Sequence, residues 1–168
     1  ADHIIGESFT VKAAPTRTGY TFDGWQSGAQ LYGAGATFTV GADDITFTAQ
    51  WTPIVYRVTY DLNRGTSTPP VQANRNYQQT FVVGAAPTRR GYTFVNWSDG
   101  TNTFNPGATY TVATSNVVLT AQWTQTSLTV TYDLGAGNAN PGPVSNLPTE
   151  ANHVIGDTFS LAAEPVWP

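Results

Sequence analysis

Apolar and polar residues alternate along several stretches of the chain. In residues 45–51, 56–62, 117–123 and 128–134 every second residue is apolar, and the residues between them are mostly Thr, Gln, Asp or Arg. A period of two with threonine on the open side is typical of half-buried β-strands. Shorter strands are predicted at residues 8–12, 20–23, 37–40, 79–83, 92–95 and 109–112. No window keeps the helical period, so the pattern predicts a mainly β protein with little helix.

Four short motifs recur at one fixed spacing. They are Ala-Pro-Thr-Arg at 14–17 and 86–89, Gly-Tyr-Thr-Phe at 19–22 and 91–94, Thr-Ala-Gln-Trp at 48–51 and 120–123, and Tyr-Asp-Leu at 60–62 and 132–134. Each second copy begins 72 positions after the first, as in 91 − 19 = 72. Residues 153–159 echo residues 3–9 after 150 positions, which is twice 72 plus 6, so an insertion of six falls between Leu134 and His153. Such self-similarity indicates an internal repeat.

The repeat predicts how the chain is divided. Residues 55–126 form a complete copy, residues 1–54 a partial copy that lacks the first strand, and residues 127–168 a partial copy that lacks the C-terminal strands. Each copy is a module of about 70 residues, a size that leaves little margin of stability.

Large aromatic residues are therefore expected to dominate the core of each module. Trp25 and Trp97 follow the aromatic strand, and Trp51 and Trp123 close the repeat. Truncating a buried tryptophan typically costs about 3–5 kcal/mol. The predicted structural core comprises Tyr20, Phe22, Trp25, Trp51, Tyr60, Leu62, Phe81, Tyr92, Phe94, Trp97, Leu119, Trp123, Tyr132 and Phe159.

Composition excludes several classes of partner. Charged residues make up 11% of the chain and the formal net charge is −4, so no clustered basic face is available for nucleic acid or for an acidic membrane surface. No apolar run reaches the roughly 18 residues that membrane insertion needs. Cysteine and methionine are both absent. Their absence excludes disulfides and thiolate sites, favours an exported protein, and is consistent with a mature or excised fragment.

Catalytic and metal-binding chemistry has little support in the sequence. His3 and His153, the two histidines, occupy one repeat position and lie outside the complete copy, so a Ser-His-Asp triad cannot be assembled there. Asp43 and Asp44 could form a calcium-ligand pair, but the second copy has Thr and Ser at 114–115 in this region, which favours a solvated turn. We therefore expect no enzymatic activity, no cofactor and no metal.

Residues 91–97 read Gly-Tyr-Thr-Phe-Val-Asn-Trp, and Trp123 follows Trp97 at the end of Leu-Thr-Ala-Gln-Trp, 123 − 97 = 26 positions later. This arrangement resembles the Listeria–Bacteroides repeat, the module also called the B-repeat of internalin B. Residues 58–63 and 86–88 fit the same pattern, and the resemblance covers the whole chain. It implies tandem β-grasp, ubiquitin-like modules in surface or secreted proteins of bacteria, which act as spacers or stalks and sometimes in adhesion, and not as enzymes.

Two functions follow as hypotheses. The first is a non-enzymatic structural spacer of an extracellular bacterial surface protein, whose short junctions near residues 52–54 and 124–126 make neighbouring repeats semi-rigid. The alternative is an adhesin segment that binds a host protein or carbohydrate through the loop 135–148 or exposed aromatics. The aromatic candidates are Tyr32, Tyr56, Tyr77, Tyr110 and Trp167, although the strand parity of most tyrosines favours packing.

The expected partners are the neighbouring repeats of the same chain. An incomplete sheet leaves an unpaired strand edge, and such an edge invites strand addition. Strand exchange with another copy of the chain, in which residues 127–168 of one molecule complete residues 1–54 of another, is therefore a further hypothesis. The alternative is that the true domain boundary is permuted relative to the boundary of the repeat.

Overall fold

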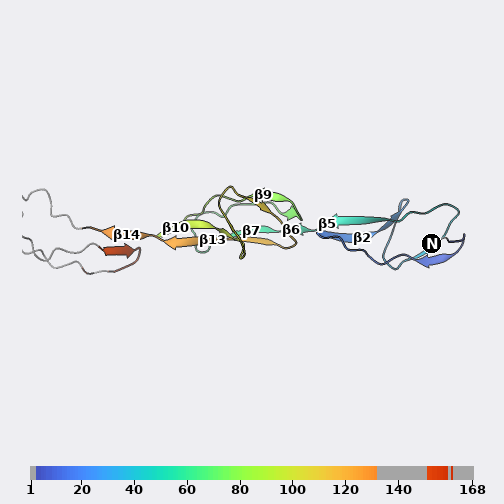
Figure 1. Ribbon diagram of the computed structural model, residues 1–168, viewed down its shortest axis with the longest axis horizontal. Helices are drawn as coiled ribbons and strands as arrows, with labels where there is room; N and C mark the ends of the chain where they lie inside the picture. Colours follow the sequence, from blue (N-terminus) through green and yellow to red (C-terminus); the bar gives the residue numbers. More distant parts are fainter. Residues whose placement is uncertain (1–2, 132–150, 159, 161–168) are drawn as a thin grey trace, which may run out of the picture. The chain divides into compact units, whose positions relative to one another are not determined.

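The computed structural model describes residues 3–131, 151–158 and 160, which form strands and turns without a helix. The mainly β prediction is therefore confirmed for this part of the chain (Figure 1). The strands up to Asp61 are β1 (Ser8–Thr10), β2 (Tyr20–Ser27), β3 (Gln30–Tyr32), β4 (Thr37–Thr39), β5 (Thr48–Pro53), β6 (Val55–Tyr56) and β7 (Val58–Asp61). They are followed by β8 (Arg75–Asn76), β9 (Thr80–Val82), β10 (Tyr92–Ser98), β11 (Thr103–Phe104), β12 (Thr109–Thr111), β13 (Val117–Gln125), β14 (Ser127–Val130) and β15 (Ala151–Val154).

The chain divides into two compact units. The first comprises Ala1–Thr59, Val71–Val83 and Gly107–Val118, and the second comprises Tyr60–Pro70, Gly84–Pro106 and Leu119–Pro168. Division into three copies at residues 54/55 and 126/127 stays a prediction of the sequence.

Two sheets repeat the same register. In the three-stranded sheet β3-β2-β5, Phe22 pairs with Trp51 and Trp25 with Ala49. In the four-stranded sheet β11-β10-β13-β7, the residues 72 positions later pair in the same way, and β10 and β13 run side by side (Figure 1). Each ladder carries a bulge at the same place, between residues 22 and 24 and between residues 94 and 96. The shared motifs therefore form shared structure.

The fourth strand of the larger sheet, β7, runs in the same direction as β13. The Val117 N–H donates to the Arg57 carbonyl at 2.8 Å, and the Asn63 side-chain amide donates to the Ala121 carbonyl at 3.0 Å. Residue numbers rise together along both strands, which is the mark of a parallel pair. Residues 45–47 of the first copy, predicted as strand from their alternation, lie outside the sheet, because no described strand occupies the place beside them.

The predicted core residues are all at least half-buried where the structure describes them. Trp97 and Leu119 are fully buried, and Phe81 is 5% exposed. Half-buried are Tyr20, Phe22, Trp25, Trp51, Tyr60, Leu62, Tyr92, Phe94 and Trp123, whereas Tyr132 and Phe159 lie outside the described residues. The sequence prediction missed much of the aliphatic core, namely Val11, Val58, Val83, Val112, Val117 and Ala121. Val58, Val117 and Ala121 lie on the apolar side of the alternating stretches 56–62 and 117–123. Val11, Val83 and Val112 directly follow short strands, where one or two inward positions give only a weak alternation signal.

Candidate inter-repeat junction

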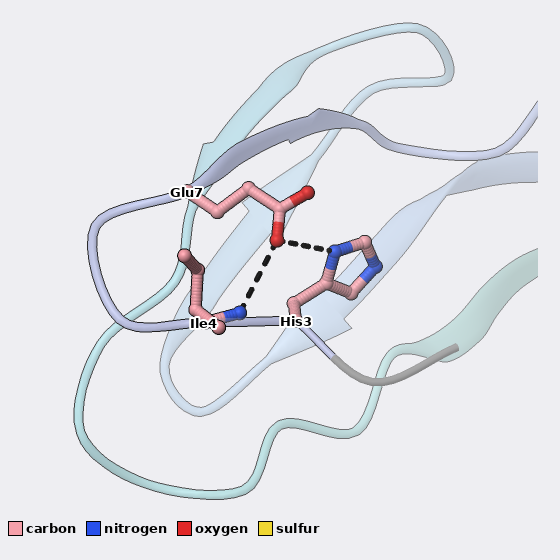
Figure 2. Close-up of polar contacts among 3 residues, drawn as sticks. All are labelled: His3, Ile4 and Glu7. Carbon is pink, nitrogen blue, oxygen red and sulfur yellow. Dashed lines mark hydrogen bonds and ion pairs between the residues drawn. The ribbon is translucent and has the colours of Figure 1, made fainter.

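Each of the two histidines directly precedes a turn and lies beside the carboxylate that ends it. The His3 ring stacks on Phe9 with ring centroids 4.6 Å apart, and its Nδ1 lies 3.1 Å from Glu7 Oε2 (Figure 2). His153 occupies the equivalent place, 3.8 Å from an oxygen of Asp157. Within the described residues no group of three or more His, Asp or Glu side chains is placed to hold a metal ion.

The same four-residue turn occurs three times, and we call residues 4–7, 76–79 and 154–157 the tip turns. In each, the N–H of the fourth residue donates to the carbonyl of the first at 3.0–3.1 Å. The third residue has a positive φ, +86° at Gly6, +65° at Gln78 and +101° at Gly156, as a type II turn requires. The second residue therefore stands at the tip of the turn, and it is Ile5, Tyr77 or Ile155.

A side-chain oxygen closes each tip turn. The N–H of the first residue donates to Glu7 Oε2 at 3.2 Å, to Gln79 Oε1 at 2.9 Å and to Asp157 Oδ2 at 2.9 Å. Figure 2 shows this contact and the His3 contact converging on one Glu7 oxygen. The Ile4 N–H and, second, the His3 side chain hold the pKa of Glu7 below its ordinary value of 4.5. Glu7 therefore keeps its acceptor charge at mildly acidic pH.

A second recurring turn contains a glycine, and we call residues 17–20 and 89–92 the glycine turns. The Tyr20 N–H donates to the Arg17 carbonyl at 3.1 Å, and the equivalent bond one repeat later, from Tyr92 to Arg89, has the same length. Gly19 and Gly91 have φ of +78° and +76°, which L side chains adopt only under strain. The arginine of each turn covers the tyrosine ring, at 3.8 Å in the first turn and 3.6 Å in the second.

Tip turns and glycine turns meet. Tyr77 packs so closely over Gly19 that a Cβ there would lie 2.7 Å from Tyr77 Cγ, and a Cβ at Gly91 would lie 3.0 Å from Ile155 Cβ. Tyr77 and Ile155 are separated by 155 − 77 = 78 positions, which matches the repeat spacing of 72 plus the insertion of six. One contact thus occurs twice, each time between a glycine turn and the tip turn that follows it in the sequence.

The backbone connection is short at both meeting points. A single residue separates β5 from β6, namely Ile54, and another separates β13 from β14, namely Thr126. The Ile54 N–H donates to the Gly19 carbonyl at 2.9 Å, and the Thr126 N–H to the Gly91 carbonyl at 2.8 Å. These residues fall in the predicted junctions at 52–54 and 124–126. The role of the tip residues was not predicted from the sequence, although Ile5 and Tyr77 lie one repeat period of 72 positions apart and could have been aligned.

Most of the aromatic binding candidates are used in packing. Tyr56 is 8% exposed, Tyr32 makes edge contacts with Phe38 and Phe47, and the Tyr110 ring stacks on Phe81 with centroids 5.2 Å apart. Tyr77 covers Gly19. Trp167 and the loop 135–148 lie outside the described residues.

Comparison with known proteins finds relatives of the chain in bacteria. It is 35% identical over 153 residues to internalin H of Listeria monocytogenes, a match that covers 86% of this chain and 25% of the relative. Two proteins of Evansella cellulosilytica, one named as a Gly-rich membrane protein and one as a membrane protein, are 34% and 33% identical, over 73% and 70% of this chain and 16% and 19% of their own lengths. The chain thus spans a quarter or less of each of these relatives.

No solved structure matches the chain. No helix in the described residues is long and apolar enough to cross a membrane. The model of the Listeria-Bacteroides repeat domain matches residues 4–50 and 56–122, which is more than half of the sequence. The chain therefore belongs to the Listeria-Bacteroides repeat family.

Proposed function

We propose that the chain is a non-enzymatic structural spacer of an extracellular bacterial surface protein, in which tandem modules, one to each period of the sequence repeat, project a distal domain. The observation that carries the proposal is the recurring contact between a glycine turn and the next tip turn. A spacer must transmit the position of one module to the next, and a packed contact with a one-residue connection resists bending more than a flexible linker does.

We further propose that each module has a β-grasp fold. Parallel pairing of β7 with β13, between strands that open and close the complete copy, supports this assignment. Antiparallel pairing of β10 with β13 and of β11 with β10 then builds the remainder of the sheet.

The spacer proposal is tested at Gly19, with Gly35 as the matched control. Both glycines have positive φ, +78° and +79°, but a Cβ at Gly35 meets nothing within 4 Å, whereas one at Gly19 overlaps Tyr77. Gly35→Ala should cost about 1–2 kcal/mol through backbone strain alone. Gly19→Ala should cost more and should also let residues 8–53 and 75–82 tumble separately, as ¹⁵N relaxation would report.

The variant Tyr77→Ala completes the test. If Tyr77 rests on Gly19, truncating it should relieve part of the penalty of Gly19→Ala, with a coupling of at least about 0.5 kcal/mol in a double-mutant cycle. Equal losses for Gly19→Ala and Gly35→Ala, with unchanged relaxation in both, would contradict a mechanical role for this contact.

A further inference from the structure

The first copy contains an apolar cavity whose lining corresponds to mostly buried residues of the complete copy. The cavity has a volume of about 300 Å³ and is lined by Phe9, Val11, Lys12, Trp25 and Phe47. The residues 72 positions later are Phe81, Val83, Gly84, Trp97 and Leu119, of which all but Gly84 are buried. In the first copy Val11 is buried but Phe9, Trp25 and Phe47 are only half-buried, whereas their counterparts Phe81, Trp97 and Leu119 are buried.

Strand β7 supplies the cover in the complete copy. The Tyr60 ring lies 4.8 Å from the Trp97 ring in an edge contact, and its hydroxyl oxygen accepts the Gly84 N–H at 2.8 Å. Burial raises the pKa of Tyr60, in keeping with an enclosed phenol. Val58, two positions earlier on the same face, is 4% exposed. No described strand stands in this place in the first copy.

The first copy also keeps the polar groups that would hold such a strand. In the complete copy the Arg57 N–H donates to Asn116 Oδ1 at 2.8 Å, and the Arg57 carbonyl accepts the Val117 N–H at 2.8 Å. The residues 72 positions earlier are Asp44, whose carboxylate can accept the same N–H, and Ile45. Within the described residues, the Ile45 N–H has no hydrogen-bond partner.

The cavity and the strand edge beside it, from Asp44 to Trp51, form a groove. At the Trp51 end of this groove the two copies can be compared in the same way. The Trp123 indole N–H donates to the Leu62 carbonyl at 3.1 Å. Its counterpart Trp51 makes no indole hydrogen bond to the part of the chain that the structure describes. The first copy thus offers three features in sequence order: the Asp44 carboxylate as acceptor, the apolar cavity, and the Trp51 indole N–H as donor. Strand β7 contacts the corresponding groups of the complete copy in the same order.

We infer that this groove binds a strand with the sequence pattern of β7, which adds in parallel beside β5 and extends that strand to Ile45. The occupant reads Val-x-Tyr-Asp-Leu, as residues 58–62 do, with the valine and tyrosine turned into the cavity. Unsatisfied backbone and indole groups along the rim favour a strand over a small apolar ligand, since such a ligand would leave them unpaired.

The test adds a synthetic peptide with the sequence of residues 54–65 to the full chain and follows amide and indole signals by NMR. Saturable binding should shift the Trp25 and Trp51 indole signals and protect the amides of residues 45–47 from exchange. A control peptide in which the residues corresponding to Val58 and Tyr60 are changed, V58D and Y60S, should bind at least about tenfold more weakly, because it loses the buried apolar surface.

Two neighbouring carboxylates provide a matched pair on the chain itself. Asp43 and Asp44 are both exposed, but only Asp44 corresponds to the acceptor Asn116. Asp44→Ala should lower the affinity for the peptide severalfold, and Asp43→Ala should leave this affinity unchanged. Absence of saturable binding, equal effects of the two substitutions, or self-association of the chain that the peptide does not compete with would each overturn the inference.

Discussion

Trp25 and Trp97 hold the same place in successive sheets and differ in burial. The indole N–H of Trp25 donates to the Lys12 carbonyl at 3.0 Å, and that of Trp97 donates to the Gly84 carbonyl at 3.2 Å, so the polar anchor is common to both. Each also meets the phenylalanine three positions earlier at 5.4 Å. Only Trp97 is covered by a tyrosine, Tyr60, and only Trp97 is fully buried. The stabilising effect of the residue thus depends on the strand beside it.

Gln78 is the member of the tip turns that departs from glycine. It has φ of +65°, where Gly6 and Gly156 occupy the equivalent positions. Backbone strain of a non-glycine residue at this φ costs roughly 1–2 kcal/mol of stability. Replacing it by glycine removes the strain, but the more flexible unfolded state of glycine offsets about 0.5–1 kcal/mol of the gain. Gln78→Gly should therefore raise the free energy of unfolding by about 0.5–1 kcal/mol in urea denaturation.

The neighbouring Gln79 supplies the control for this substitution. Its side chain accepts the Asn76 N–H, so Gln79→Gly removes a cap and should destabilise the chain by about 1 kcal/mol. A loss of stability in Gln78→Gly as large as that in Gln79→Gly would show that the positive φ carries no strain.

At the scale of elements, the tip turns differ in how they respond to acid. The first is closed by a carboxylate, Glu7, and the second by a neutral amide, Gln79. The pKa of Glu7 in the folded protein lies below its ordinary value of 4.5. The stabilisation of the folded state by the charged Glu7 is therefore complete above pH 4.5 and is lost as the pH falls through the lowered folded pKa. Gln79 has no proton to gain.

Acidification should therefore loosen the first tip turn and spare the second. We expect the Ile4 amide signal to titrate with a midpoint below 4.5, while the Asn76 amide stays unchanged apart from effects of other groups. Glu7→Gln should abolish the Ile4 titration. An Ile4 midpoint above the ordinary carboxyl range would mean that Glu7 is not stabilised in its charged form.

At the scale of the whole molecule, the copies should differ in stability. Residues 72 positions apart are Trp25 and Trp97, Val40 and Val112, and Phe47 and Leu119; the first of each pair is half-buried and the second fully buried. Since apolar burial is the main stabilising term, the first copy should open more readily.

Native-state hydrogen exchange tests this difference. Amides of β2 and β5 should exchange faster than those of β10 and β13, although the two ladders have the same register. The peptide of residues 54–65 should slow exchange in β5 and leave β13 unaffected. Equal protection in both ladders without peptide would show that the open cavity does not weaken the first copy.

Alternation of residues predicted the long strands because their registers are set by many inward positions. Residues 117–123 lie within β13 (Val117–Gln125), the shorter prediction 92–95 lies within β10 (Tyr92–Ser98), and the predicted core residues Trp97 and Leu119 are buried. Short pairings such as β6 with β8 have only two residues on each side and leave no periodic signal. Residues 45–47 alternate like a strand but lack a neighbour, so the pattern alone could not predict that they stay outside the sheet.

The position of each junction could be predicted from the sequence, but the side chains that form its contact could not. Residues 52–54 and 124–126 were identified from spacing, whereas the contact between Gly19 and Tyr77 joins positions far apart in the sequence and differs in side chain from that of Gly91 and Ile155. The contact requires only that a large side chain at the tip of the turn covers the surface left free by the glycine, and both tyrosine and isoleucine can do so.

The complete copy carries both halves of the joint, a tip turn at 76–79 and a glycine turn at 89–92, within one period of the repeat. Duplication or deletion of one such stretch should therefore leave each tip between two modules facing a glycine. We therefore expect an array built in this way to tolerate a change in copy number, because no new interface has to form when a period is added or removed.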